Sequence, residues 1–158
     1  RRILFLDGGG APGAVERLRG YRRAMQHAGQ PELIRPGGLT EREGAAAASA
    51  IVASGEWPDA VFAFNDRCAL GVMDVFIRSG IAVPQDVSVL GYDDSALAGL
   101  AHINLSTLRQ DAAGLAAGAV QRLVGRLEGP ADGRDERAAD LVREPQLIAR
   151  QTTAPPTR

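Results

Sequence analysis

Four polar side chains in this chain could together bind a ligand rich in hydroxyl groups: Arg17, Asn65, Asp93 and Gln110. A carboxylate accepts hydrogen bonds from hydroxyl groups, whereas arginine, asparagine and glutamine side chains donate to ring and hydroxyl oxygens. The same residue types also cap the ends of ordinary helices and strands. Residue type and spacing alone therefore leave a polyol site and a structural role both open, and they favour the structural role.

Catalytic and metal chemistry have less support. Asp93 and Asp94 could form a pair of metal-binding or phosphate-accepting carboxylates, but adjacent residues that leave a strand point in different directions. His27 and His102 have no partners at the spacing of metal ligands, and no serine or cysteine lies in a nucleophile-elbow motif. We expect no metal, no cofactor and no covalent catalysis.

A run of three glycines, Gly8 to Gly10, follows an apolar segment and could cradle a phosphate. The complete dinucleotide-binding motif requires a third glycine at the start of the helix and an acidic residue about 20 positions later. The following Pro12-Gly13 does not reproduce this spacing. A flexible loop is therefore the favoured interpretation, and an α/β enzyme that uses a nucleotide remains an alternative.

The elements that must position these residues alternate between short apolar runs and helical patterns. Strands are predicted at residues 3–6, 33–34, 60–64 and 86–90, helices at 14–28, 40–55, 66–79 and 111–127, further extended segments at 105–109 and 141–150, and a charged loop at 129–139. Thr40 and Glu43 form a capping box at the start of the second helix. This alternation predicts an α/β fold, with a parallel sheet wound by helices on both faces.

Ligands of such sheets bind beyond the carboxyl ends of the strands. Residues 7–10, 65–66 and 92–94 follow three of the predicted strands. We therefore expect any ligand site to include side chains from these three segments.

The composition restricts the class of protein. The 158 residues are enough for one compact unit, and the 19 acidic and 18 basic residues nearly cancel, so this segment alone should bind nucleic acid poorly. Cys68 is the single cysteine and cannot form an intrachain disulfide, and no stretch has the length of a membrane span or the build of a secretory signal. We expect a cytoplasmic protein. Because Arg1 opens directly into an apolar run, we also expect further sequence upstream.

Several motifs together resemble the LacI/GalR family of transcriptional repressors. They lie at residues 17–21, 58–66 with 69–71, 80–94, 105–110 and 150–156. The segment Gly80-Ile-Ala-Val-Pro-Gln-Asp-Val-Ser-Val-Leu-Gly-Tyr-Asp-Asp94 is the most distinctive of them. The resemblance extends over essentially the whole chain and implies a two-lobed ligand domain of the type I periplasmic-binding-protein kind.

The resemblance also implies how the chain is divided. Residues 1–110 would be the C-terminal lobe, 111–128 a helix that belongs to the N-terminal lobe, and 140–158 the return crossover and C-terminal tail. The DNA-binding helix-turn-helix headpiece would be absent from this chain. Leu115, Ala119, Val120, Leu123, Val124 and Leu127 would then form an apolar stripe that lacks part of its cover.

The resemblance implies a role for each of several individual residues in the ligand site. Arg17 matches the family's ligand-gripping arginine, Asn65 the asparagine at a strand end, Asp93 the ligand carboxylate and Gln110 a polar residue at the lobe crossover. Leu39 stands where relatives often place an aromatic ring against the ligand, and this departure leaves the identity of the ligand open. Asp7 is a further candidate for the wall of the site.

The helix at residues 66–79 is apolar over most of its circumference. It could be a deeply buried core helix. The resemblance implies instead that one flank, including Leu70, Met73 and Ile77, forms a two-fold dimer interface.

The resemblance therefore implies the effector-sensing domain of a homodimeric LacI-type regulator, and not an enzyme. A sugar or related metabolite would bind between the lobes, shift their orientation and so change the affinity of the headpieces for operator DNA. The alternative is a sugar-binding receptor of an ABC transporter with the same fold.

Overall fold

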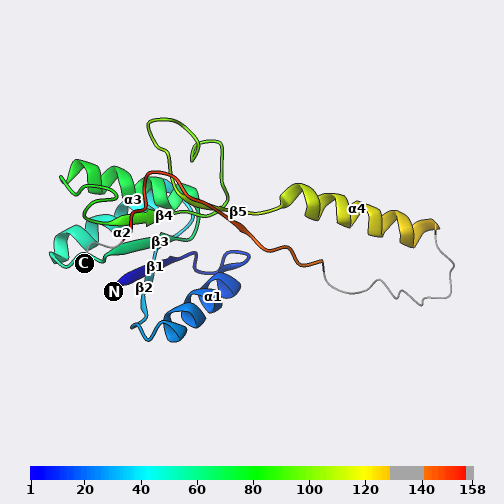
Figure 1. Ribbon diagram of the computed structural model, residues 1–158, viewed down its shortest axis with the longest axis horizontal. Coiled ribbons are helices and arrows are strands. Elements are labelled where there is room, and N and C mark those ends of the chain that lie inside the picture. Colours follow the sequence, from blue (N-terminus) through cyan, green and yellow to red (C-terminus); the bar gives the residue numbers. More distant parts are fainter. Residues whose placement is uncertain (129–140, 156–158) are drawn as a thin grey trace.

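The computed structural model describes residues 1–128 and 141–155, and its centre is a parallel sheet of four strands (Figure 1). The strands are β1 (Ile3–Asp7), β2 (Leu33–Pro36), β3 (Ala60–Ala63) and β4 (Ser88–Leu90), in the order β2-β1-β3-β4. The helices are α1 (Ala14–His27), α2 (Glu41–Ser54), α3 (Asp66–Arg78) and α4 (Ala112–Glu128). A separate antiparallel pair joins β5 (Thr107–Arg109) to β6 (Gln146–Ile148).

Helices cover both faces of the sheet, as the sequence predicts. Side chains of a strand alternate between its two faces, and β1 follows this rule: Leu4 and Leu6 belong to the core that α2 and α3 share, whereas Phe5 packs against Tyr21 and Met25 of α1. The larger core therefore lies between the sheet and the α2–α3 pair, and the smaller one lies under α1 (Figure 1).

Local sequence explains where α2 and α3 begin. The predicted capping box is confirmed: the Thr40 side chain accepts a hydrogen bond from the Glu43 backbone N–H, and the Glu43 carboxylate accepts from the Thr40 N–H. The Asn65 side chain caps α3 by accepting from the Cys68 N–H at 2.8 Å. Glycine allows the two helices to touch, because a Cβ on Gly71 would lie 2.0 Å from the Glu41 carbonyl oxygen.

Several predicted segments are longer than the elements observed. The strand predicted from residue 86 begins at Ser88, because the chain turns at Asp86, whose carboxylate accepts from the Ala82 N–H. The extended segment predicted at 141–150 contributes only β6, which starts directly after Pro145, a residue without a backbone N–H. The charged loop predicted at 129–139 lies outside the described residues.

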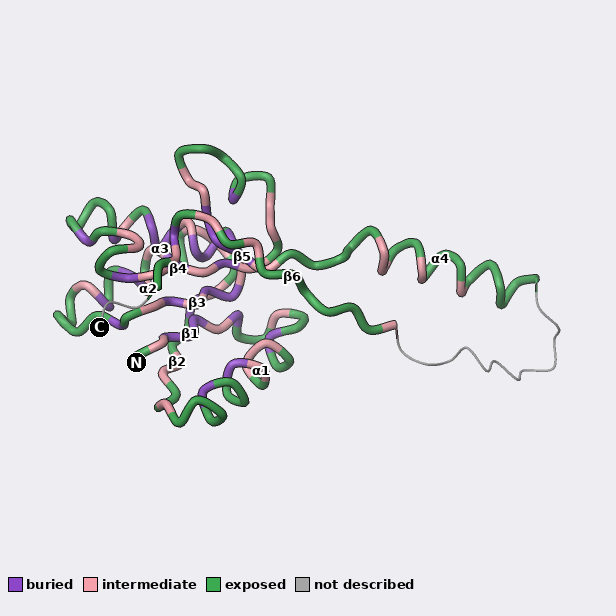
Figure 2. The backbone as a smooth tube through the Cα atoms, in the orientation of Figure 1, coloured by how far each residue is buried: buried purple, intermediate pink, exposed green. Residues whose placement is uncertain are grey.

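Helix α4 lies away from the body of the molecule, at the end of the two crossover segments that contain β5 and β6 (Figure 1). No described residue of α4 is buried (Figure 2), and the side chains of Val120, Leu123 and Leu127 are 60%, 59% and 77% exposed. Within residues 1–128 and 141–155, no helix has both the length and the apolar character needed to cross a bilayer.

Helix α3 is partly a buried core helix and partly exposed along one flank, the two possibilities that its sequence leaves open. Phe76 and Val72 are fully buried, and Met73 is only 8% exposed and belongs to the core, so it offers little surface to another subunit. Leu70 is half-buried and Ile77 is 60% exposed. The surface available on this flank therefore comes from Leu70 and Ile77.

Candidate functional site

Arg17 lies at the carboxyl edge of the sheet, between two aromatic rings that the sequence reasoning did not include. Its guanidinium carbon is 4.2 Å from the centroid of the Phe64 ring and 3.7 Å from that of the Tyr92 ring. One guanidinium nitrogen donates to the Phe64 carbonyl at 2.6 Å. Stacking between aromatic faces favours a cation and fixes its plane. The sandwich therefore holds Arg17 in a defined orientation at this edge.

Asp93 and Gln110 lie beside this arginine. The Asp93 Oδ1 is 3.8 Å from the nearer Arg17 nitrogen and accepts a hydrogen bond from Gln110 Nε2 at 2.8 Å. Burial raises the pKa of the Asp93 carboxyl, although Arg17 and Gln110 act in the opposite direction. The side chain is still 41% exposed, so the carboxylate can receive further hydrogen bonds from a ligand.

Asn65 and Leu39 meet on the neighbouring side of the same edge. Asn65 Nδ2 donates to the Leu39 carbonyl oxygen at 3.0 Å, while its Oδ1 caps α3. The carbonyl group of the Asn65 side chain is therefore used inside the protein, and its amide keeps one further donor. Leu39 is 40% exposed and offers apolar contact without an aromatic face.

The glycine loop after β1 has a structural explanation at two of its three glycines. A Cβ on Gly8 would lie 2.6 Å from the Phe64 ring, and Gly9 has a φ of 61°. Asp7 holds the loop, because its Oδ1 accepts from the Gly9 N–H at 3.1 Å and its carbonyl oxygen accepts from the Gly37 N–H. This packing agrees with the loop interpretation of the three glycines.

A second carboxylate, Asp94, was missed as a partner of the site. Its side chain is only 9% exposed and accepts 2.6 Å hydrogen bonds from Arg109 Nε and from Arg150 Nη2. Burial alone would raise the pKa of Asp94, but the two arginines outweigh it and hold the pKa below its ordinary value. Asp93 and Asp94 therefore have separate partners and do not form one carboxylate pair.

Asp66 holds the segment that follows Asp94. It is 1% exposed, and its carboxylate accepts hydrogen bonds from the Thr107 hydroxyl at 2.6 Å and from the Ser95 N–H at 2.7 Å. Gly91 is required beside it, because a Cβ there would lie 2.3 Å from Asp66 Oδ1. The sequence places Asp66 directly after a strand, but nothing local identifies Thr107 as its partner.

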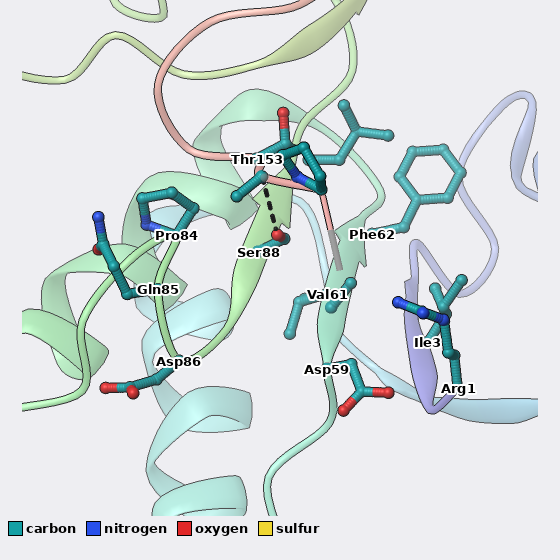
Figure 3. A pocket seen from close by; sticks show the side chains of 14 residues that line it. Arg1, Ile3, Asp59, Val61, Phe62, Pro84, Gln85, Asp86, Ser88 and Thr153 are labelled. Carbon is teal, nitrogen blue, oxygen red and sulfur yellow. Dashed lines mark hydrogen bonds between the residues drawn. The ribbon is translucent and has the colours of Figure 1, made fainter. Parts of the chain in front are cut away.

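A hollow of about 770 Å³, drawn in Figure 3, lies elsewhere on the molecule. Its walls include Ile3, Phe62 and Leu90, which face the α1 side of the sheet, and Thr153 to Pro155 of the tail. Asp59 and other residues that precede β3 and β4 also line it, so it lies towards the amino ends of these strands. None of the predicted site residues lines it, and ligands of open α/β sheets bind at the opposite edge.

The structure thus brings together Arg17, Asp93 and Gln110 as a donor and acceptor group, with Asn65, Leu39 and Asp7 around the same edge. Phe64 and Tyr92, which orient the arginine, carry a sequence signal: Phe64 ends the apolar run predicted as a strand at 60–64, and Tyr92 lies two residues after the one predicted at 86–90. Among the described residues, no three His, Cys, Asp or Glu side chains are grouped to hold a metal ion. The arrangement offers hydrogen bonds and one carboxylate to a neutral polar ligand.

Comparisons with known proteins agree with this fold. Residues 1–153 match the family model described as a periplasmic binding protein-like domain. The HTH-type transcriptional repressor PurR of Vibrio atlanticus is 33% identical over 141 residues, which is 87% of this chain and 41% of that protein.

Solved structures show the same relationship. A LacI transcriptional regulator from a Rhodococcus species matches with a TM-score of 0.88 and 42% identity, over 98% of this chain and 56% of that chain. The regulator CelR in complex with cellobiose matches with a TM-score of 0.80 and 33% identity, over 96% of this chain and 46% of that chain. The chain spans about half the length of these relatives. It belongs to the periplasmic binding protein-like family, as the C-terminal effector-binding part found in LacI-type transcriptional regulators.

Proposed function

We propose that this chain senses a small neutral polyol, most simply a sugar, and that binding at the Arg17–Asp93–Gln110 group changes how strongly the whole protein binds operator DNA. The observation that carries the proposal is the position of that group. It lies at the carboxyl edge of the sheet, where its Gln110 directly precedes Asp111 and α4. A ligand held there touches both the body and the start of the segment that leaves it.

The shape of the chain supports a second lobe that closes over this edge. We assign residues 1–110 to the C-terminal lobe, and α4 presents the exposed apolar residues Val120, Leu123 and Leu127 outside it. We assign α4 to the N-terminal lobe and residues 140–158 to the return crossover and tail. A ligand enclosed between two such lobes changes their orientation only if it binds one orientation better than the other.

The ligand class is argued from the chemistry of the edge. Arg17 is already stacked on Phe64 and Tyr92 and paired with Asp93, so it is balanced in charge and suits hydroxyl groups better than an anion. The relative CelR is solved with cellobiose, which is a ligand of this kind. Leu39 in place of an aromatic ring favours a ligand that needs little stacking.

The remaining parts of the proposal concern assembly and partners. We propose that the protein acts in the cytoplasm as a homodimer, with Ile77 and Leu70 on the exposed flank of α3 at the interface and Met73 behind them. DNA contact is assigned to a headpiece outside this chain. No catalytic step is proposed, because its relatives are transcriptional regulators and the site offers recognition groups only.

The experiment is a DNA-binding titration of the full-length protein, using fluorescence anisotropy and the DNA upstream of its own operon. Cellobiose, a set of monosaccharides and their phosphates are added in turn. We expect at least one neutral sugar to change the affinity for DNA by roughly 5- to 150-fold, the usual range of allosteric coupling. A protein that binds the DNA with the same affinity in every case would contradict the proposed function, as would one that binds no DNA.

A further inference from the structure

The loop that carries Asp93 is attached to both segments that lead out to α4, and the attachment passes through Asp94. Asp94 follows Asp93 directly, and its carboxylate is shared by two arginines from different segments. Arg109 is the last residue of β5, and Arg150 lies two residues after the end of β6. One nearly buried carboxylate therefore connects the outgoing and the returning crossover.

Hydrogen bonds that do not involve the Asp94 carboxylate make the same connection. The Asp93 N–H donates to the Leu108 carbonyl oxygen at 2.8 Å, and the Asp94 N–H donates to the Thr107 hydroxyl at 3.3 Å. From the returning segment, the Arg150 guanidinium Nη1 donates to the Leu105 carbonyl oxygen at 2.7 Å. The loop and the β5–β6 pair therefore form one hydrogen-bonded unit between the body and α4 (Figure 1).

The backbone of this loop is held in an unusual conformation. Asp93 has a φ of 115° and Asp94 a φ of 50°, which residues other than glycine adopt rarely. Such conformations persist where surrounding contacts determine them. The two arginines and the Leu108 carbonyl group are contacts of that kind.

We propose that Asp94 is a positioning residue that makes the effector-binding carboxylate of Asp93 and the two crossover segments move as one unit. The proposal rests on the proposed function, because it takes Asp93 as the ligand contact and α4 as part of the second lobe. A movement of Asp93 on ligand binding is then transmitted to Arg109 and Arg150 together. The orientation of the second lobe follows the position of one carboxylate.

The test measures the orientation of α4 relative to the body without ligand or DNA. Spin labels are placed on the full-length protein at Ala50→Cys in α2 and Gln121→Cys in α4, both exposed positions, with any accessible cysteine outside this chain replaced by serine. Cys68 can stay, because burial raises the pKa of its thiol to about 12 and keeps it unreactive towards the label. Electron–electron double resonance then gives the distribution of distances between the labels.

The variant is Asp94→Asn, which removes the charge but keeps a side chain that tolerates positive φ. The matched control is Glu32→Gln, whose carboxylate pairs with Arg22 on the exposed surface at 3.1 Å. We expect a displaced or broadened distribution for Asp94→Asn and an unchanged one for Glu32→Gln. Arg109→Gln, at a half-exposed position, should give a smaller change of the same kind and decides the question if Asp94→Asn does not fold.

Loss of stability alone would lower the melting temperature without moving the distance distribution of the folded protein. Distributions that match the control in both Asp94→Asn and Arg109→Gln would overturn the proposal. Because neither ligand nor DNA is present, this failure is distinct from failure of the proposed function, which the DNA titration measures.

Discussion

Helices α3 and α4 have similar apolar content but opposite surroundings. In α3, Val72 and Phe76 are completely buried against the sheet and α2, whereas in α4 Leu123 and Leu127 are 59% and 77% exposed. Burying one leucine side chain contributes roughly 1.5–3 kcal/mol, so a helix with several bare apolar residues forgoes a large stabilisation. The difference shows that α3 belongs to the core of this chain, and it is what we expect if α4 completes the core of the proposed N-terminal lobe.

The largest expected effect is on the association of the isolated 158-residue chain. Because its α4 stripe is bare, we expect this chain to aggregate or to exchange α4 between molecules, and light scattering should show species larger than a monomer. The double variant Val120→Glu with Leu123→Glu should shift the chain towards monomers. Val15→Glu, at a 61% exposed apolar position of α1, is the matched control and should not. A monodisperse monomer of the unaltered chain would contradict the comparison.

Core truncation should separate the two helices clearly. Phe76→Ala leaves a cavity at a fully buried position and should lower the free energy of unfolding by about 3–5 kcal/mol. Leu127→Ala in the same 158-residue chain should change it by less than about 0.5 kcal/mol, because the side chain has little to lose. Both changes in the free energy of unfolding are measured by urea denaturation in the Val120→Glu, Leu123→Glu double variant, which we expect to be monomeric. Equal costs would show that α4 is packed within the chain.

Glycine replacement sharpens the same contrast on a smaller scale. Gly71→Ala forces a Cβ against the Glu41 carbonyl oxygen of α2 and should cost about 1–3 kcal/mol. Gly118→Ala in α4 meets only the end of the Leu141 side chain, which can rotate away, and gains up to about 1 kcal/mol of helix propensity. We therefore expect Gly71→Ala to lower the urea midpoint and Gly118→Ala to raise it. Destabilisation by both variants would mean that Leu141 is held firmly against α4.

The smallest effects concern pH and distinguish the two adjacent carboxylates. The lowered pKa of Asp94 means that it stabilises the folded state above the ordinary aspartate pKa, and this contribution is lost as the pH falls through the folded pKa. The raised pKa of Asp93 has the opposite effect: its contribution is present below the ordinary pKa and is lost as the pH rises through the folded pKa.

Urea midpoints measured from acid to neutral pH test these signs. Asp94→Asn should lose stability at neutral pH and show a weaker decline towards acid. Asp93→Asn should lose little or gain at neutral pH. A decline of the same steepness in Asp94→Asn and in the unaltered protein would show that the arginine pair does not set the pKa of Asp94.

Sequence reasoning succeeds where short-range patterns decide the structure. The capping box at Thr40 and Glu43, the polar residues Asp7 and Asn65 at or just after the ends of β1 and β3, and the alternation that gives a parallel sheet are all local signals. Their outcome depends on neighbours within a few residues, so a single sequence is sufficient. Helix and strand limits shift by a few residues because tertiary contacts set them.

Long-range partnerships are the part that the sequence does not reveal. Asp94 meets Arg150, 56 positions later, only because β6 pairs with β5 in one register. The sandwich around Arg17 likewise depends on two strands that end beside each other. Met73 is a further example, since it lies in a core cluster together with residues of the sheet and of α2.

The most direct test of the proposed effector site is a thermal-shift titration of the full-length protein with a neutral sugar panel that includes cellobiose. It is repeated with Asp93→Ala and with Gln85→Ala, a residue that lines the hollow of Figure 3. A ligand at 100 times its dissociation constant stabilises the folded state by about 2.7 kcal/mol. We expect a stabilising sugar whose effect is lost in Asp93→Ala and kept in Gln85→Ala. A stabilisation that survives Asp93→Ala, or one that disappears with Gln85→Ala, would contradict the assignment of the effector site to the carboxyl edge of the sheet.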